Sequence, residues 1–157
     1  MNQHATQLHA ATFALLVKGQ LEAATKYFAT DYTVHLTDQD SRSGHELIRS
    51  VVGLYQGAFD ALSVEVVVLV ETSDLVAWQR TLRATHRGAF KGFPGTDLPI
   101  TWREMVVSRF AGSLIAEEWI VTDLAERLLL GRKAVSAKPK RGAPKSKSRR
   151  PRSSGDA

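Results

Sequence analysis

An acidic residue, Asp123, ends a segment whose pattern predicts two strands joined by a tight turn, residues 109–123. Because side chains alternate along a strand, Glu117 and Trp119 share a face with Asp123. If that face is buried, the Asp123 carboxyl lies in an apolar interior, which is costly and typical of acid–base groups at functional sites. The alternative is a structural role, because Asp is a preferred N-cap residue and a helix is expected to begin at Leu124.

Two further carboxyl groups precede Asp123 in the same strand. Glu117 shares the expected interior face, and two interior carboxyls would raise the pKa of at least one of them. Glu118 has the opposite phase, so the alternation predicts that it faces solvent or a partner subunit. Glu117 is therefore a secondary site candidate.

Basic and imidazole side chains supply the other candidates. A strand expected over residues 75–90 places Trp78, Arg80 and His86 on one face. An interior Arg80 needs a carboxylate partner or a ligand, and the alternative is a β-bulge that turns it outward. For His86 the alternative to a site role is a structural hydrogen bond at the strand end. For His35 a structural role is the favoured interpretation, with a site role as the alternative.

Aromatic residues are spread over every expected element, and most of them must form the core. Tyr32, Trp78 and Trp119 lie in candidate pocket-lining segments. Phe93 lies in a loop containing Gly and Pro between two long strands, which suits a turn at a pocket rim. These residues favour an apolar or planar ligand.

The elements that must position these side chains are helices first and strands second. Ser43 and Glu46 fit a capping box ahead of an amphipathic helix, and Gly131 is expected to stop the last helix. The other expected elements are helices over 3–18, 20–28 and 124–130 and strands over 64–70, 75–90, 100–110 and 114–122. This order predicts an α+β domain in which helices cover one face of a curved antiparallel sheet and leave an internal pocket.

Composition limits the class of protein. A chain of 157 residues with 43% hydrophobic residues suits one domain with a real core. There is no Cys, the five His residues show no zinc spacing, and no Gly-rich phosphate loop occurs. The N-terminus does not resemble a signal peptide, and no apolar run has the 18 or more residues of a membrane helix. We expect no metal and no membrane contact, and a cytoplasmic location.

The net charge of +5 is unevenly distributed. Residues 132–157 carry +9, whereas residues 1–131 carry −4. The segment 132–157 is rich in Lys, Arg, Pro and Ser and has no aromatic residue, so we expect a disordered basic tail after a domain over 1–131. Such a tail suits binding to nucleic acid or another polyanion without sequence preference, and the alternative is a solubilising extension.

Six segments in order resemble the SnoaL-like polyketide cyclases of the nuclear transport factor 2-like (NTF2-like) superfamily. The resemblance covers nearly all of residues 8–131, and Glu118 stands where the family often has His. The matching segments are DYTVH at 31–35, DLVA at 74–77, ATHRG at 84–88, GFPGTD at 92–97, RFAGSLI at 109–115 and EEWIVTD at 117–123. The resemblance implies an NTF2-like cone and a homodimer through the outer sheet face.

The resemblance also implies a chemistry, the closure of a ring by an intramolecular aldol reaction without metal or cofactor. The acid/base of that reaction is an acidic residue near the end of the last strand, here Asp123, and His86 or His35 would donate to the enolate oxygen. A cofactor-independent lyase or isomerase acting on a small hydrophobic carbonyl compound is therefore one expected function. The alternative is a non-catalytic ligand-binding or dimeric scaffold protein whose basic tail binds a polyanion.

Overall fold

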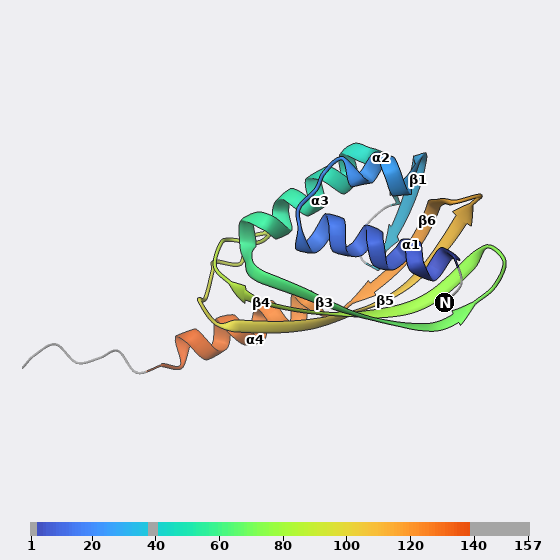
Figure 1. Ribbon diagram of the computed structural model, residues 1–157. Coiled ribbons are helices and arrows are strands. Elements are labelled where there is room, and N and C mark those ends of the chain that lie inside the picture. The colour runs from blue at the N-terminus through green and yellow to red at the C-terminus, as the bar shows by residue number, and fades with distance from the viewer. Residues whose placement is uncertain (1–2, 38–40, 139–157) are drawn as a thin grey trace, which may run out of the picture.

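The computed structural model describes residues 3–37 and 41–138. A curved six-stranded sheet has the strand order β2-β1-β6-β5-β4-β3, and α1, α2 and α3 cover one side of it (Figure 1). The elements are α1 (Gln3–Thr12), the π-helical turn η1 (Phe13–Val17), α2 (Ala23–Tyr27), β1 (Phe28–Leu36), β2 (Arg42–Ser43), α3 (His45–Ala58), β3 (Phe59–Glu71), β4 (Leu75–His86), β5 (Pro99–Ala111), β6 (Leu114–Thr122) and α4 (Leu124–Ser136). The predicted α+β class is confirmed.

The sheet is mixed, whereas the sequence pattern predicts an antiparallel one. Strands β3 to β6 pair antiparallel, but β1 pairs parallel with β6. This pairing joins the first strand of the chain to the last strand, β6. Alternation within each strand carries no information about such a long-range neighbour.

The first two helices form much as predicted. One helical segment runs from Gln3 through η1 to Val17, and Gly19 follows it with φ +63°. This left-handed conformation costs glycine little, so Gly19 ends the helix as expected. The second helix, α2, is shorter than predicted and begins at Ala23.

The predicted capping box at α3 is wrong. The N-cap residue is Gly44, with φ +92°, and no side chain caps the helix. Ser43 belongs instead to β2, where it pairs with Thr33. Glu46 forms an ion pair with Arg49 on the next turn of the helix.

The last helix does not stop at Gly131. Helix α4 continues to Ser136 and therefore includes the first residues of the predicted basic tail. Residues 139–157, which carry most of that tail, lie outside the described residues. No helix among the described residues combines the length and apolar character needed to cross a bilayer.

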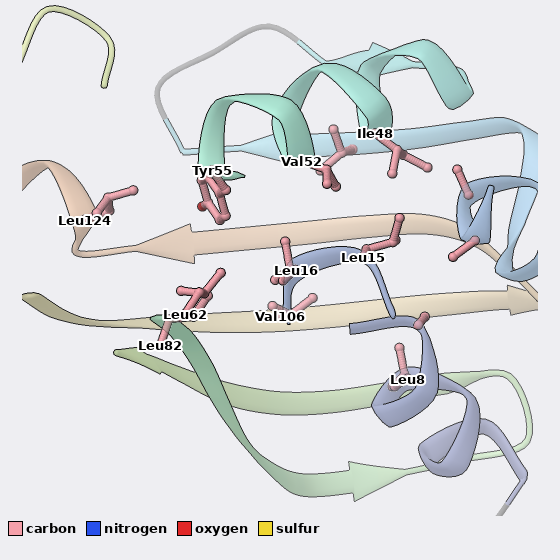
Figure 2. Close-up of a cluster of buried hydrophobic side chains, with 14 of the residues drawn as sticks. Leu8, Leu15, Leu16, Ile48, Val52, Tyr55, Leu62, Leu82, Val106 and Leu124 are labelled. Carbon is pink, nitrogen blue, oxygen red and sulfur yellow. The ribbon is translucent and has the colours of Figure 1, made fainter. Parts of the chain in front are cut away.

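The hydrophobic core lies between the helices and the sheet (Figure 2). Leu8, Leu16 and Val52 face the sheet from the helices, and Leu82 and Val106 face them from β4 and β5. Strand β5 alternates strictly between buried and less buried positions, which shows that one of its faces belongs entirely to the interior.

Candidate ligand pocket

A cavity of about 360 Å³ opens between the sheet and the helices. Most of its wall is apolar, contributed by helical residues such as Leu8 and Val52 and by strand residues such as Ile115. A few polar side chains interrupt this wall. This composition is typical of a site for a small apolar molecule held by a few polar contacts.

A β-bulge in β6 decides which side chains face this cavity. Arg109 of β5 pairs with Glu117, but the next residue, Phe110, pairs with Ile115. Ala116 is therefore an extra residue without a partner, and both Ile115 and Ala116 are buried. The extra residue reverses the phase of the alternation for the rest of the strand.

Beyond the bulge, the interior residues of β6 are the opposite of those predicted. Glu118 is 5% exposed and lines the cavity together with Ile120. Trp119 is 40% exposed and Val121 is 59% exposed. The prediction that Glu118 faces solvent or a partner subunit is wrong, and so is the expectation that Trp119 lies on an interior face.

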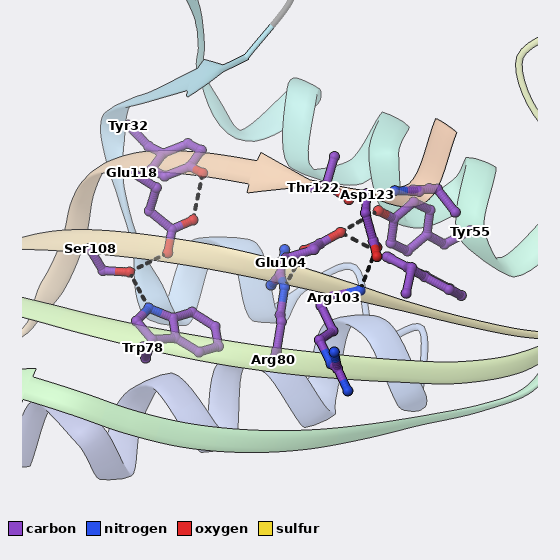
Figure 3. Close-up of polar contacts among 12 residues, drawn as sticks. Tyr32, Tyr55, Trp78, Arg80, Arg103, Glu104, Ser108, Glu118, Thr122 and Asp123 are labelled. Atoms are coloured by element: carbon purple, nitrogen blue, oxygen red, sulfur yellow. Dashed lines mark hydrogen bonds and ion pairs between the residues drawn. The ribbon is translucent and has the colours of Figure 1, made fainter. Parts of the chain in front are cut away.

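Glu118 is held in the pocket wall by hydrogen bonds from two hydroxyl groups (Figure 3). The Tyr32 hydroxyl donates to Oε2 at 2.8 Å, and Ser108 Oγ donates to Oε1 at 2.6 Å. Ser108 in turn accepts a hydrogen bond from Trp78 Nε1 at 2.9 Å. Burial raises the pKa of Glu118, and nearby Arg80 and the two hydroxyls offset only part of this rise.

A second buried carboxylate, Glu104, binds Arg80. The Arg80 guanidinium donates through Nε to Glu104, and the Tyr55 hydroxyl and Trp102 Nε1 each donate to Glu104 Oε1 at 3.1 Å. Burial opposes the charge of Arg80, but Glu104, Tyr55 and Glu118 together raise its pKa. Arg80 therefore lies inside with a carboxylate partner, the first of the two alternatives.

The phenol groups act as fixed donors in this cluster. Burial raises the pKa of Tyr32, and the adjacent Glu118 raises it further. The pKa of Tyr55 is raised in the same way, by burial and by Glu104. Both phenols therefore keep their protons and donate to carboxylates at neutral pH.

Asp123 lies beside the cavity rather than in its wall. Its Oδ1 accepts from the Arg103 backbone N–H at 2.7 Å, and its Oδ2 pairs with Arg127 Nε at 3.0 Å. It occupies the N-cap position of α4 but makes no capping bond through its side chain. Its neighbours Thr122 and Leu124 do line the cavity, so Asp123 is close to the site.

His86 is buried but does not line this cavity. It borders a separate hollow between α4 and the start of β5. Its ring packs against Phe59, with centroids 5.5 Å apart, and Nε2 has no hydrogen-bond partner among the described residues. Burial lowers the pKa of His86, so the neutral ring is favoured.

His35 and Glu117 lie outside the cavity wall and form a surface cluster. His35 Nε2 donates to Glu117 Oε1 at 2.8 Å, and Arg109 Nε donates to Glu117 Oε2 at 2.9 Å. These hydrogen bonds from His35 and Arg109 lower the pKa of Glu117. The Trp119 ring stacks on His35, with centroids 5.1 Å apart, so these three predicted site residues meet one another but not the pocket.

The predicted residues that do line the pocket are Tyr32, Trp78, Arg80 and Phe93. Glu104 was missed, although a signal was present. It stands in phase with Trp102 and Val106 on β5, so alternation alone places this acid on an apolar face.

Comparison with known proteins agrees with this architecture. A sequence model of the SnoaL-like polyketide cyclase family matches residues 6–129, and the chain belongs to this family. A search of curated proteins found no significant match. The family predicted from the six segments is therefore confirmed.

Solved structures of similar proteins share the fold over most of their length. IdmH from Streptomyces antibioticus, provisionally assigned as a polyketide cyclase, is 27% identical with a TM-score of 0.70, over 84% of this chain and 99% of IdmH. A provisionally assigned polyketide cyclase from Acidithiobacillus ferrooxidans is 26% identical with a TM-score of 0.75, over 85% of this chain and 96% of the other. AclR from Streptomyces galilaeus, provisionally assigned as a hydroxylase, is 25% identical with a TM-score of 0.70, over 87% of this chain and 98% of AclR. The fold therefore accompanies more than one assigned chemistry.

Proposed function

We propose that the protein binds a small hydrophobic carbonyl compound in the pocket and acts as a cofactor-independent lyase or isomerase of the cyclase type, with Glu118 as acid/base. The observation that carries this proposal is the position of Glu118, a buried carboxyl of raised pKa in a mostly apolar wall that also contains Arg80. A base whose pKa approaches the working pH is suited to removing a proton from carbon.

The pocket offers a group for each charge that this reaction creates. Glu118 takes a proton from the carbon next to a carbonyl, and the electrons of the broken C–H bond move to the carbonyl oxygen. The Arg80 guanidinium stabilises the enolate oxygen that results. The enolate carbon then bonds to a second carbonyl carbon, and Glu118 returns its proton to the oxygen of that carbonyl. Proton and electrons balance without a further reactant.

Asp123 is the second candidate for the acid/base role. The family resemblance points to this residue, and its position beside the cavity allows it to approach a ligand at the rim. Its carboxylate, however, is already bound by the Arg103 backbone and Arg127. His86 is a weaker donor candidate because it borders the other hollow.

Exchange of carbon-bound hydrogen for deuterium tests the proposal before the natural substrate is known. Hydrophobic aryl methyl ketones are incubated with the protein in D₂O and followed by NMR. We expect Glu118→Gln to slow exchange by about a hundredfold or more, because general bases contribute at least that much. Since the base must be ionised, the rate should rise with pH through the pKa of Glu118.

The matched comparison uses Asp123→Asn and, as a surface control, Glu126→Gln. If Asp123→Asn abolishes exchange and Glu118→Gln does not, Asp123 is the base and Glu118 is structural. If the wild-type protein shows no exchange with any ketone, the catalytic proposal fails.

A non-catalytic ligand-binding function is the second candidate, and one observation favours it. Both oxygens of Glu118 already accept hydrogen bonds from Tyr32 and Ser108, as in a satisfied structural network. In that case ketones should raise the unfolding temperature of the protein without exchange of their protons.

We also propose that the outer face of the sheet forms a homodimer interface. The described residues leave apolar side chains exposed there on β5 and β6, with a further one on β3 across Gln79 of β4: Met105, Val107, Trp119, Val121 and Val67. Contiguous exposed apolar surface is typical of protein–protein contacts.

For the basic tail we propose binding to polyanions such as nucleic acid. Of its charged residues, those after residue 138 lie outside the described part of the chain. Binding should weaken steeply with added salt, because it depends on counterion release. A chain ending at residue 138 that binds duplex DNA as tightly as the full chain would contradict this proposal.

A further inference from the structure

The guanidinium of Arg80 is only partly satisfied by protein groups. Its Nε donates to Glu104, and its two terminal nitrogens have no hydrogen-bond partner among the described residues. The side chain is 13% exposed and lines the pocket, with the Trp78 ring 5.4 Å from the guanidinium carbon. Four N–H donors of a buried cation therefore have no acceptor except what enters the cavity.

Glu118 lies in the same cavity without an ion pair to Arg80 among the described residues, although the two charges interact. Arg80 is already paired with Glu104, and the wall contains two carboxyls, the Arg80 guanidinium and the Lys91 ammonium. A ligand anion at Arg80 would add a third negative charge to a poorly solvated space. Neighbouring negative charges raise the pKa of each other's carboxyl groups, which favours uptake of a proton by one of them.

We propose that the pocket selects hydrophobic ligands with an acidic oxygen, a carboxylate or an enolate, which binds the terminal nitrogens of Arg80 while Glu118 takes up a proton. This inference rests on the proposed function, because it concerns the same site. An enolate at Arg80 beside a protonated Glu118 is the state reached after proton transfer. A stable carboxylate bound at Arg80 imitates this state, and in that case Glu118 takes its proton from solvent.

Comparison with the other titratable groups of the pocket wall indicates that Glu118 is the group that accepts this proton. Titratable or charged groups of the pocket wall come from β1, α3, β4, β5 and the β4–β5 connection, whereas α1 contributes Leu8, Ala11 and Thr12, none of which titrates. These groups are Tyr32, Tyr55, Arg80, Lys91 and Glu104. Both phenols are already protonated, and Glu104 is bound by Arg80 and two further donors.

Calorimetry with matched acids and esters tests the proposal on the full chain. The probes are naphthoate and decanoate, each compared with its methyl ester, in buffers of different ionisation enthalpy. We expect each acid to bind at least about tenfold more tightly than its ester, as one charged hydrogen-bonded contact supplies. We also expect uptake of up to about one proton per acid bound, with affinity falling as pH rises.

Two variants test proton uptake by Glu118 and anion binding by Arg80 separately. Glu118→Gln should still bind the acids, but without proton uptake and with an affinity independent of pH. Arg80→Met combined with Glu104→Gln removes both buried charges together and should abolish the preference for acid over ester. Glu126→Gln on the surface serves as the control, and thermal unfolding verifies that each variant is folded.

Several outcomes would overturn the inference. These are esters that bind as tightly as the acids, acids that bind without proton uptake, and failure of both acids to bind at any pH. The deuterium exchange of neutral ketones is measured independently. Exchange without acid preference therefore rejects this inference alone, whereas acid preference without exchange rejects the catalytic proposal alone.

Discussion

Glu118 and Arg80 show how single side chains define the chemistry of this pocket. Each is a charged group in an apolar wall, and each is held there by specific partners, hydroxyls for Glu118 and Glu104 for Arg80. A buried charge without such partners would cost several kcal/mol, about 3–5 when one partner of a buried pair is removed. The network therefore keeps two ionisable groups inside the molecule.

Removal of the Tyr32 hydroxyl tests how this hydrogen bond affects the pKa of Glu118. In Tyr32→Phe the carboxyl loses a hydrogen bond that lowers its pKa, so the pKa of Glu118 should rise further. Stability should fall by about 1 kcal/mol, a typical value for one buried hydrogen bond. Carbon-13 NMR of the carboxyl and urea unfolding measure the two effects. Tyr27→Phe is the matched control, and an unchanged Glu118 pKa would contradict the prediction.

His86 should make stability depend on pH. Burial lowers its pKa in the folded protein below the unfolded value of 6.5, so the unfolded chain binds more protons in this range. The stability that neutral His86 contributes is therefore complete above pH 6.5 and is lost as pH falls below it. His86→Phe should flatten this part of the profile of unfolding free energy against pH. Parallel wild-type and variant profiles would count against the prediction.

At the scale of elements, one bulge in β6 exchanges the two faces of a strand. Ala116 adds a residue opposite β5, so the positions after it face the other side of the sheet. Glu118 enters the pocket, and Trp119 joins His35 on the outer face. The location of the candidate acid/base therefore depends on one unpaired residue.

Replacing two glycines by Ala should change the stability of the protein in opposite directions. A Cβ at Gly131, inside α4, would meet nothing closer than Thr96 Cγ2 at 4.0 Å. Gly131→Ala should therefore stabilise the protein by about 0.5–1 kcal/mol, since glycine weakens helix interiors. A Cβ at Gly95 would lie 1.8 Å from the Arg87 carbonyl oxygen, so Gly95→Ala should destabilise it. Thermal unfolding compares the two, and a fall in melting temperature for Gly131→Ala would refute the first prediction.

At the scale of the whole molecule, the sheet separates two surfaces with different roles. Its inner face carries the pocket, and its outer face carries the exposed apolar residues proposed to form a dimer. The long strands β3, β4 and β5 contribute to both faces. A dimer through the outer face would leave the pocket lining untouched.

A charge placed on the outer face should dissociate the proposed dimer. Val107→Glu puts a carboxylate in the middle of the apolar group, next to Trp119 across the β5–β6 pair. We expect the molar mass from light scattering to halve, because burying an unpaired charge is costly. Leu130→Glu on α4 introduces the same charge at a similarly exposed position and should not change the mass. A wild-type monomer would exclude the interface.

Much of this protein is determined by local sequence pattern. Periodicity and turn residues predict the order of helices and strands, the α+β class and a shared strand face for Trp78 and Arg80, because each depends on neighbours along the chain. Six short segments are enough to identify the family. Glu104 was predictable in the same way from the alternation of β5.

Three features of the site depend on tertiary contacts that the local sequence pattern does not reveal. The parallel pairing of β1 with β6, the bulge at Ala116 and the pairing of Arg80 with Glu104 all depend on residues far apart in the sequence. Because a strand has period two, one extra residue moves every later side chain to the other face. The sequence alone therefore determines the α+β class and the order of its elements, whereas only the packed sheet sets the β1–β6 pairing and places Glu118 inside the pocket, with Asp123 beside it.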